Sequence, residues 1–215
     1  MKVLQNKAIF LDRDGVVSLE KGYISSLEEL EIYPFARQAV IKLKEAGWKV
    51  FIITNQSGVA RGILTEKELN FIHQRLLEEI PVDKIYYCPH HPDGKAGSPY
   101  SIQCHCRKPE PGMIFRAARE NHIDLSRSYL LGDRASDILA GKRSGLTTVL
   151  VRTGYGVRGL EQEVEPDYIF ADLGEFVEYL MGERLDADYD DPPGVATLIV
   201  SFREHLFGEK RDNNV

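Results

Sequence analysis

The side chains best suited to chemistry stand directly after short apolar segments, at widely separated points of the chain. They are Asp12, Asp14, Thr54, Asn55 and Asp133. Each apolar segment is typical of a buried strand, and open parallel sheets bind their ligands at the carboxyl ends of the strands. We therefore expect these side chains to converge at one sheet edge. Asp12 and Asp14 alone could equally cap a turn, so the prediction depends on the other three.

Two of these carboxylates have the character of magnesium ligands. Mg²⁺ prefers hard oxygen donors and is usually held by one or two carboxylates with a substrate phosphate, and Asp12 and Asp133 would provide the carboxylates. A phosphoryl group beside Asp12 meets like charge, so the metal and a nearby cation must neutralise it; we favour Lys108 as that cation. Thr54 and the backbone amides of residues 55–58, at a turn from strand to helix, would donate hydrogen bonds to the same phosphate.

A second metal site is predicted from clustered cysteine and histidine residues. Three thiolates and one imidazole form a complete tetrahedral set for Zn²⁺, and with no position left open this zinc would be structural. The predicted ligands are Cys88, His90, Cys104 and Cys106. His91 and His105 compete for the fourth position, and reduced cysteines beside a surface histidine are the alternative. Arg107 and Lys108 follow directly, so fixing this loop would fix two cations.

Composition narrows the class of protein. The chain has 215 residues, of which 43% are apolar, enough for one sizeable core. A net charge of −6 and a pI near 5.6 argue against nucleic acid as a partner. No apolar stretch matches a signal sequence or a membrane span, so we expect a cytoplasmic protein without a membrane partner. Three cysteines in such a chain argue against a disulfide framework.

The elements that must position these residues alternate along the chain. Short apolar runs predict strands at residues 7–11, 48–53, 84–87, 129–131, 147–151 and 168–170. Helical spacing predicts helices at residues 35–46, 65–80, 111–120 and 136–143, and a last one that carries Phe176, Val177 and Leu180. Thr65 and Glu68 match a capping box, and glycines end two of the helices. The alternation predicts an α/β fold with a doubly wound parallel sheet.

Two segments break the alternation. Residues 88–111 contain many Pro, Gly, His and Ser residues without a period, so they form a long loop that needs a stabiliser, which zinc would supply. Residues 183–215 begin with an acidic, proline-bearing stretch. We expect a domain at residues 1–182, followed by an acidic linker and a C-terminal appendage at 183–215. The appendage is either a solvated tail or a regulatory or oligomerising element.

Four motifs resemble, in order, those of the haloacid-dehalogenase-superfamily phosphatases, over residues 7–182. They are Asp12-Arg13-Asp14-Gly15, Thr54-Asn55-Gln56-Ser57-Gly58, Cys106-Arg107-Lys108-Pro109 and Gly132-Asp133-Arg134. The resemblance implies a Rossmann-type fold, Asp12 as the nucleophile and Asp14 as general acid and base. It also implies Mg²⁺ ligation by Asp12, the Asp14 carbonyl and Asp133. Asp137 would either support that metal site or merely sit favourably at a helix N-terminus.

The zinc loop resembles that of two groups within this superfamily, the heptose-bisphosphate phosphatases and the histidinol-phosphate phosphatases. The long gap before Cys104 matches the heptose group, since the gap is shorter in the histidinol group. This resemblance implies hydrolysis of the 7-phosphate of D-glycero-D-manno-heptose 1,7-bisphosphate. It implies substrate contacts by Glu20, Lys21, Gly22, Tyr23, Thr54, Asn55, Gln56, Ser57, Arg107, Lys108 and Arg134. Glu20 and Lys21 lie in a variable stretch, and residues 183–215 match neither group.

Other functions stay open on the sequence alone. Histidinol phosphate is the alternative substrate. A noncatalytic interaction module built on the zinc loop is the alternative of another class, although it leaves Asp12, Asp14, Lys108 and Asp133 without a role. The expected partners are Mg²⁺, Zn²⁺ and a small phosphorylated sugar, and we expect a monomer.

Overall fold

The computed structural model describes residues 6–159 and 164–182. The chain divides into two units, residues 1–179 and 180–215. The last helix crosses this boundary, and the other features below belong to the first unit. The predicted appendage at residues 183–215 lies outside the described residues. Among the residues described, no helix has the length and hydropathy needed to cross a bilayer.

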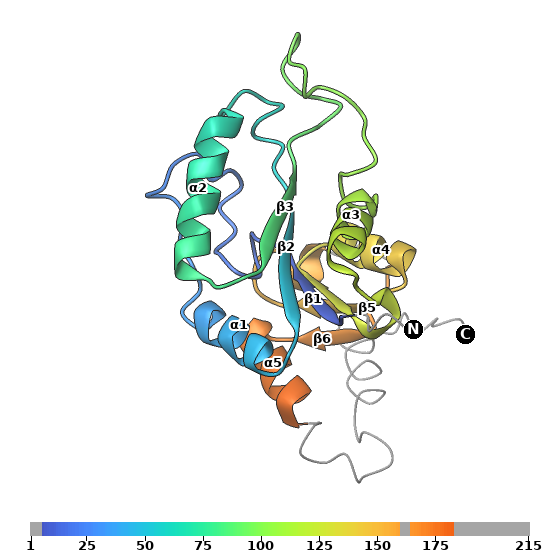
Figure 1. The fold of residues 1–215 in the computed structure, drawn as a ribbon. Coiled ribbons are helices and arrows are strands. Elements are labelled where there is room, and N and C mark those ends of the chain that lie inside the picture. The colour runs from blue at the N-terminus through green and yellow to red at the C-terminus, as the bar shows by residue number, and fades with distance from the viewer. Residues whose placement is uncertain (1–5, 160–163, 183–215) are drawn as a thin grey trace, which may run out of the picture. The chain divides into compact units, whose positions relative to one another are not determined.

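A six-stranded, fully parallel sheet forms the centre of the first unit, in the order β3-β2-β1-β4-β5-β6 (Figure 1). The strands are β1 (Ala8–Leu11), β2 (Lys49–Asn55), β3 (Lys84–Cys88), β4 (Tyr129–Gly132), β5 (Thr147–Val151) and β6 (Tyr168–Phe170). Every residue of β1 is fully buried, as expected for a central strand covered on both faces. The α/β, doubly wound fold predicted from the alternation is confirmed.

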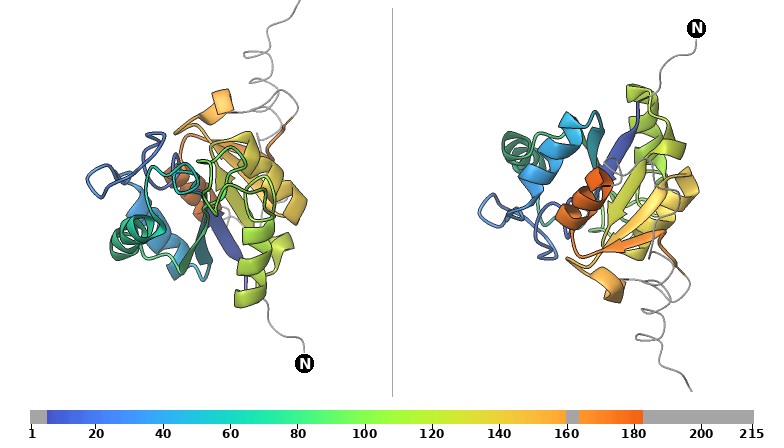
Figure 2. Two further views of the ribbon diagram at one scale, coloured as in Figure 1. Left: turned by 90° about the horizontal axis from the view of Figure 1, so that it is seen from above. Right: turned by 90° about the horizontal axis from the view of Figure 1, so that it is seen from below.

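Helices cover both faces of the sheet. They are α1 (Ala36–Glu45), α2 (Glu66–Glu79), α3 (Gly112–Asn121), α4 (Ala135–Ser144) and α5 (Leu173–Gly182). Two further views show α1 and α2 on one face and α3 and α4 on the other (Figure 2). Short 3₁₀ turns occupy Leu125–Arg127 and Gly156–Gly159.

The predicted helix ends follow from local chemistry. Thr65 and Glu68 form the reciprocal capping box at the start of α2. Gly145 ends α4 with φ near 75°, a left-handed conformation that glycine adopts without strain. The clearest difference from the prediction is at β2, which extends to Asn55 because Thr54 and Asn55 pair with Tyr87 and Cys88 of β3.

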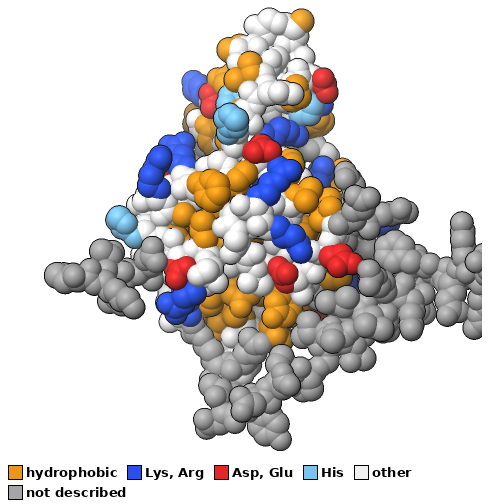
Figure 3. Space-filling view, turned by 90° about the vertical axis from the view of Figure 1, so that its right-hand side faces the viewer, with side chains coloured by type: hydrophobic (Ala, Val, Ile, Leu, Met, Phe, Trp, Pro, Cys, Tyr) orange, Lys and Arg blue, Asp and Glu red, His pale blue; other side chains and the backbone are white. Residues whose placement is uncertain are grey.

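The long loop after β3 projects beyond the carboxyl edge of the sheet (Figure 1). Figure 3 shows it as a narrow tip that carries histidine side chains, with lysine and arginine side chains below it. The loop also contacts the segment that follows β2. The amide of Ala60 donates to the carbonyl of Pro89 at 3.2 Å, and the amide of Lys95 donates to the carbonyl of Ala60 at 2.8 Å. The two segments are therefore braced against each other.

Candidate active site

The two central strands bring the first pair of carboxylates together. Leu11 of β1 pairs with Leu131 of β4 in parallel register, and the amide of Asp12 donates to the carbonyl of Leu131 at 2.9 Å. Asp12 therefore leaves the sheet beside Asp133, which follows β4. These strands flank the point where the strand order reverses, which is where doubly wound sheets bind ligands.

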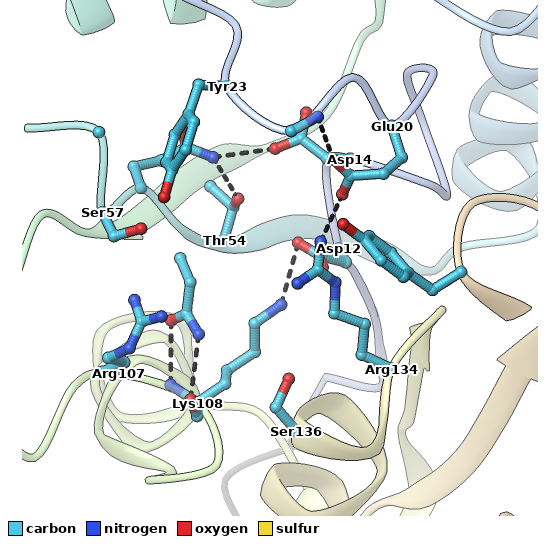
Figure 4. Close-up of a pocket in the computed structure, with 15 residues that line it drawn as sticks. Asp12, Asp14, Glu20, Tyr23, Thr54, Ser57, Arg107, Lys108, Arg134 and Ser136 are labelled. Carbon is cyan, nitrogen blue, oxygen red and sulfur yellow. Dashed lines mark hydrogen bonds and ion pairs between the residues drawn. The ribbon is translucent and has the colours of Figure 1, made fainter. Parts of the chain in front are cut away.

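A cavity of about 250 Å³ opens at this edge, close to the lower end of the range for small-molecule sites. Asp12, Asp14 and every predicted substrate contact except Lys21 line it. Ser136 and Tyr155 line it as well, although the sequence analysis did not single them out. The side chains in Figure 4 approach the cavity from the ends of several strands and from the early loop. Its volume suits a small phosphate ester.

Lys108 lies at the floor of this cavity with its side chain only 1% exposed. Its ammonium group contacts Asp12 Oδ1 at 2.9 Å (Figure 4). It also contacts Asp137 Oδ1 at 2.5 Å and donates to the Ile53 carbonyl at 2.8 Å. An ammonium group has three hydrogens, so all are used. Burial opposes the charge, but the two carboxylates raise the pKa of Lys108 overall, which keeps it cationic.

Asn55 holds the backbone of that lysine in place. Its side-chain oxygen accepts from the Lys108 amide and its side-chain amide donates to the Lys108 carbonyl, both at 3.0 Å. Both polar groups of Asn55 therefore face Lys108. We had expected the backbone amides of residues 55–58 to donate to a phosphate. The amide of Gln56 instead donates to the carbonyl of Cys88 at 2.8 Å, so it is not available to one. Turns follow β2, and α2 begins at Glu66 with Thr65 as its N-cap, in agreement with the predicted helix start.

Three buried acids surround a common point beside the cavity. Carboxylate oxygens of Asp12, Asp133 and Asp137 all lie within 4.8 Å of one another. Burial raises the pKa of Asp12 to about 7, against the opposing charge of Lys108, and burial with the neighbouring Asp12 raises the pKa of Asp133 to about 8. Three such groups disfavour one another's negative charge, and a divalent cation would relieve that cost.

The environment of Asp133 fits a magnesium ligand. Its Oδ2 accepts from the amide of Tyr155 at 2.8 Å. Its Oδ1 is buried and has no hydrogen-bond partner among the described residues, with Arg134 Nε 3.9 Å away. An unsatisfied buried carboxylate oxygen needs an explanation, and a hard cation supplies one. Glycines make room around this side chain: a Cβ atom at Gly15 or Gly154 would lie 2.3 or 2.2 Å from Asp133 Oδ2. Both glycines also have positive φ, near 85° and 65°.

Asp14 lines the cavity, and hydrogen bonds from neighbouring residues fix its side chain. Its two carboxylate oxygens accept hydrogen bonds from Arg13, Ser18 and Gln56. Burial alone would raise the pKa of Asp14, but the charge and hydrogen bonds of Arg13 lower it overall. Gln56 also donates to the hydroxyl of Thr54 at 2.7 Å, so the two residues that flank Asp14 in the cavity are linked.

The early loop meets α4 at the cavity rim. Arg134 Nη2 pairs with Glu20 Oε2 at 2.8 Å, and the Arg134 guanidinium lies 3.7 Å from the centre of the Tyr155 ring, which is 44% exposed. Lys21, a predicted contact, instead pairs with Glu31 at 2.9 Å outside the cavity lining. Arg134 is thus the cation that the rim presents on this side.

The second cluster lies at the base of the projecting loop. The sulfur atoms of Cys88, Cys104 and Cys106 lie 3.2 to 3.4 Å apart, and Nδ1 of His90 lies 3.4 Å from Cys106. These spacings exclude disulfide bonds and suit four donors around one ion. Close contacts with Cys88 and Cys104 lower the pKa of Cys106 to about 5, and the contact with Cys106 raises the pKa of Cys88. A cation at the centre would be needed for all three to be the thiolates that a metal site requires.

His90, and not its neighbour, completes this cluster. Nδ1 of His91 instead accepts from the amide of Asp93 at 3.0 Å. The guanidinium of Arg107 donates to the carbonyl of His90 at 3.3 Å, which joins the cluster directly to a residue of the cavity lining. The four donors could therefore hold a metal ion that fixes the position of Arg107.

Comparisons with known proteins agree with this geometry. A family model for HAD-hydrolase-like proteins matches residues 105–176. The chain is 40% identical to the D-glycero-D-manno-heptose-1,7-bisphosphate 7-phosphatase of Thermosynechococcus vestitus, over 80% of this chain and 94% of that protein. It is 35% identical to the D-glycero-beta-D-manno-heptose-1,7-bisphosphate 7-phosphatase of Escherichia coli K12, over 84% of this chain and 96% of that protein.

A solved structure is similar to this protein over most of the length of both chains. The D,D-heptose 1,7-bisphosphate phosphatase of B. bronchiseptica, complexed with magnesium and phosphate, superposes with a TM-score of 0.72 at 38% identity. The match covers 82% of this chain and 99% of that one. A homologue of the same fold therefore binds the ion that the Asp12 and Asp133 cluster fits.

Proposed function

This chain belongs to the family of the heptose-1,7-bisphosphate 7-phosphatases, within the haloacid-dehalogenase-like hydrolases, and we propose that it removes the 7-phosphate of D-glycero-D-manno-heptose 1,7-bisphosphate. The observation that carries the proposal is the buried pair of Asp12 and Lys108, 2.9 Å apart, in a cavity whose lining includes Arg107 and Arg134. In this proposal Asp12 is the nucleophilic carboxylate, and the three cations bind the two phosphates.

In the proposed reaction, a carboxylate oxygen of Asp12 attacks phosphorus and the bond to the C7 oxygen breaks. Asp14, whose pKa the neighbouring Arg13 lowers, must bind a proton when substrate enters the cavity and gives that proton to the sugar oxygen, so the sugar leaves as an alcohol and Asp12 carries the phosphate. Water then attacks phosphorus, Asp14 takes a proton from the water, and the Asp12 carboxylate is restored with release of inorganic phosphate. Lys108 stays charged throughout and offsets the negative charge that gathers beside Asp12.

The residues proposed to hold Mg²⁺ are Asp12, Asp133 and the carbonyl of Asp14. The buried Oδ1 of Asp133, which accepts no hydrogen bond from the described residues, supports this assignment. When bound, the ion would lower the repulsion between the phosphate and the buried carboxylates. Asp137, whose two oxygens contact Lys108 and the amide of Arg134, is proposed to orient the lysine.

We propose Zn²⁺ for the site of Cys88, His90, Cys104 and Cys106, because a Cys₃His set matches the ligand preference of that ion. Its role would be structural. The ion would hold both ends of the loop, and through them the backbone that carries Arg107 and Lys108. The proposed catalytic domain is residues 1–182, in a cytoplasmic monomer.

The second phosphate of the substrate is proposed to meet Arg107 and Arg134. Arg134 pairs with Glu20 at 2.8 Å, so a phosphate must displace that carboxylate or share the guanidinium with it. Histidinol phosphate carries no second phosphate and brings a cationic amine. The two arginines would therefore disfavour it, which makes this substrate the sharpest comparison.

The test compares kcat/KM for heptose 1,7-bisphosphate and histidinol phosphate with Mg²⁺ present. We expect the bisphosphate to be hydrolysed far more efficiently, at the 7-phosphate alone. Arg107→Ala should reduce this preference, mainly through lower activity on the bisphosphate, whereas Arg116→Ala, on the exposed face of α3, should leave it unchanged. Asp12→Asn should abolish both activities and keep the fold. Equal or better turnover of histidinol phosphate would overturn the heptose assignment, and activity in Asp12→Asn would overturn the covalent mechanism.

A further inference from the structure

Arg13 is a buried arginine to which the proposed reaction gives no task. It is 1% exposed and is the largest of the fully buried side chains in the part of the chain that the structure describes. Burying a guanidinium is unfavourable unless its donors are satisfied by well-placed acceptors. The groups that contact the Arg13 guanidinium therefore indicate its role.

One edge of the guanidinium faces Asp14. Arg13 Nε donates to Asp14 Oδ1 at 2.9 Å and Nη2 donates to Asp14 Oδ2 at 2.8 Å. Two parallel hydrogen bonds from a rigid planar group fix the plane of a carboxylate as well as its distance. A lysine at this position could offer only a point charge. The Asp14 side chain is thus oriented by the residue that directly precedes it in the chain.

The opposite side of the guanidinium is fixed from α2. Arg13 Nη1 lies 3.3 Å from Nε2 of His73, which is 4% exposed. Arginine has no acceptor, so Nε2 must accept this bond and the ring proton must be on Nδ1. Burial, and then the charge of Arg13, lower the pKa of His73 to about 3, so the ring is neutral and able to accept. The ring also packs at 5.2 Å from the ring of Tyr87 on β3.

We propose that Arg13 and His73 form a positioning pair, which holds the carboxyl group of Asp14 in the orientation needed to pass a proton to the leaving sugar oxygen. The inference rests on the proposed function, because it assigns the pair a task in that reaction. Neither residue touches substrate: His73 fixes Arg13, and Arg13 fixes Asp14. Ser18 and Gln56 also donate to the carboxylate, and one of these two bonds must open when Asp14 binds the proton that it passes on. A carboxyl group that must both give and take a proton needs one defined position within hydrogen-bond reach of the reacting atoms.

The proposal predicts a dependence on the leaving group that a structural role does not predict. A sugar oxygen leaves as an alkoxide unless it is protonated, so it needs Asp14. A nitrophenolate leaves readily without a proton. Because kcat/KM reports the steps up to formation of the phosphoenzyme, loss of Asp14 alignment should lower it for the sugar bisphosphate much more than for p-nitrophenyl phosphate.

The experiment measures kcat/KM on both substrates, with Mg²⁺, for the full-length chain and four variants. Asp14→Asn removes the proton donor, so its kcat/KM should fall much more on the bisphosphate than on p-nitrophenyl phosphate. Arg13→Lys is expected to lose at least about 10-fold more on the bisphosphate than on p-nitrophenyl phosphate. His73→Leu, which removes the acceptor, should show the same asymmetry in weaker form. His73→Gln keeps an acceptor oxygen near the position of Nε2 and should restore most of the difference.

The outcomes distinguish failure of the proposed function from failure of the positioning role of Arg13 and His73. If the wild-type chain hydrolyses neither substrate, or Asp12→Asn remains active, the proposed function fails. If the wild type is active and Arg13→Lys and His73→Leu lose equally on both substrates, the pair is only structural and the positioning role is refuted. Thermal unfolding of each variant is measured in parallel. Should Arg13→Lys fail to fold, the contrast between His73→Leu and His73→Gln decides alone.

Discussion

Replacing Lys108 with methionine tests the electrostatic design of the site most directly. The substitution keeps much of the side-chain volume and removes the cation that contacts Asp12, Asp137 and the Ile53 carbonyl. Two buried carboxylates would then face each other without a counter-charge. We expect a large loss of stability and of activity.

The magnitude follows from burial. Removing one partner of a buried ion pair costs about 3 to 5 kcal/mol, because the remaining charge is left uncompensated in a poorly solvated position. That is a large part of the about 5 to 15 kcal/mol by which most domains are stable. By contrast, Lys49→Met removes a surface pair with Asp83, at 3.4 Å with the lysine 44% exposed, and should cost no more than about 1 kcal/mol.

The assay is urea unfolding of Lys108→Met, Lys49→Met and the wild type between pH 5 and 8, without Mg²⁺. Burial already raises the pKa of Asp12 to about 7, and the charge of Lys108 opposes that rise. Loss of the lysine must therefore raise this pKa further. A carboxyl group with a raised pKa in the folded state destabilises the fold as pH increases, up to that pKa. Wild type and Lys108→Met should therefore lose stability in parallel up to about pH 7, and the deficit of the variant should grow above it, where Asp12 ionises in the wild type alone.

Asp137→Asn in the Lys108→Met background removes the second uncompensated charge and should recover part of the lost stability. Activity should stay at least about 100-fold below wild type in both, since the charge beside Asp12 is still missing. A folded Lys108→Met protein that loses less than about 1 kcal/mol at pH 8, with no dependence on pH, would refute this account.

Further predictions concern metal, pH, close packing and the tail. The purified protein should hold about one zinc per chain by metal analysis, and Cys104→Ser should lose the zinc together with activity. His73, whose pKa falls from 6.5 to about 3 on burial, should make the free energy of unfolding decrease by about 1.4 kcal/mol per pH unit as pH falls below 6.5, a slope that His73→Phe should lack. Gly154→Ala should weaken Mg²⁺ binding, because its Cβ would lie 2.2 Å from Asp133 Oδ2. Removal of residues 183–215 should leave kcat/KM largely unchanged.

Each of these predictions would be contradicted by a specific result. Native thiols that all titrate freely, with no zinc in the protein, would refute the zinc site. Equal pH slopes for His73→Phe and wild type would show that His73 does not change its protonation on folding. Gly145→Ala is the control for Gly154→Ala, since it has a similar φ of 75° and no atom within 4 Å of the added Cβ. A tenfold fall in kcat for a folded, truncated chain would place part of the site after residue 182.

Sequence patterns predicted the frame well because parallel strands and amphipathic helices leave strong local signals. The apolar run before Asp12 and the capping box at Thr65 are examples, and both elements are found where they were expected. The end of β2 was placed too early because Thr54 and Asn55 are polar, while pairing with β3 keeps them in the strand. Long-range pairing of this kind leaves no mark in a short window.

Contacts between side chains that are far apart in the sequence could not be predicted in the same way. The spacing of Leu69, Ile72 and Leu76 does place His73 on the buried stripe of α2, so its burial had a signal. Nothing in the sequence says that the partner of this histidine is Arg13, 60 residues away. The pair of Glu20 and Arg134 is likewise set by how the early loop folds over the sheet, which follows no periodic pattern.

The bracing of the projecting loop has a consequence for how this protein can change over time. Cys88 and Cys106 tie the two ends of the loop at one cluster, so Arg107 and Lys108 stay in place whatever lies between those ends. Lengthening a loop closed in this way adds only about 0.6 kcal/mol of closure entropy per doubling. The exposed turn at Ala96 and Gly97, where a Cβ at the glycine would meet no atom within 4 Å, is therefore a place where insertions can accumulate, or be engineered, without disturbing catalysis.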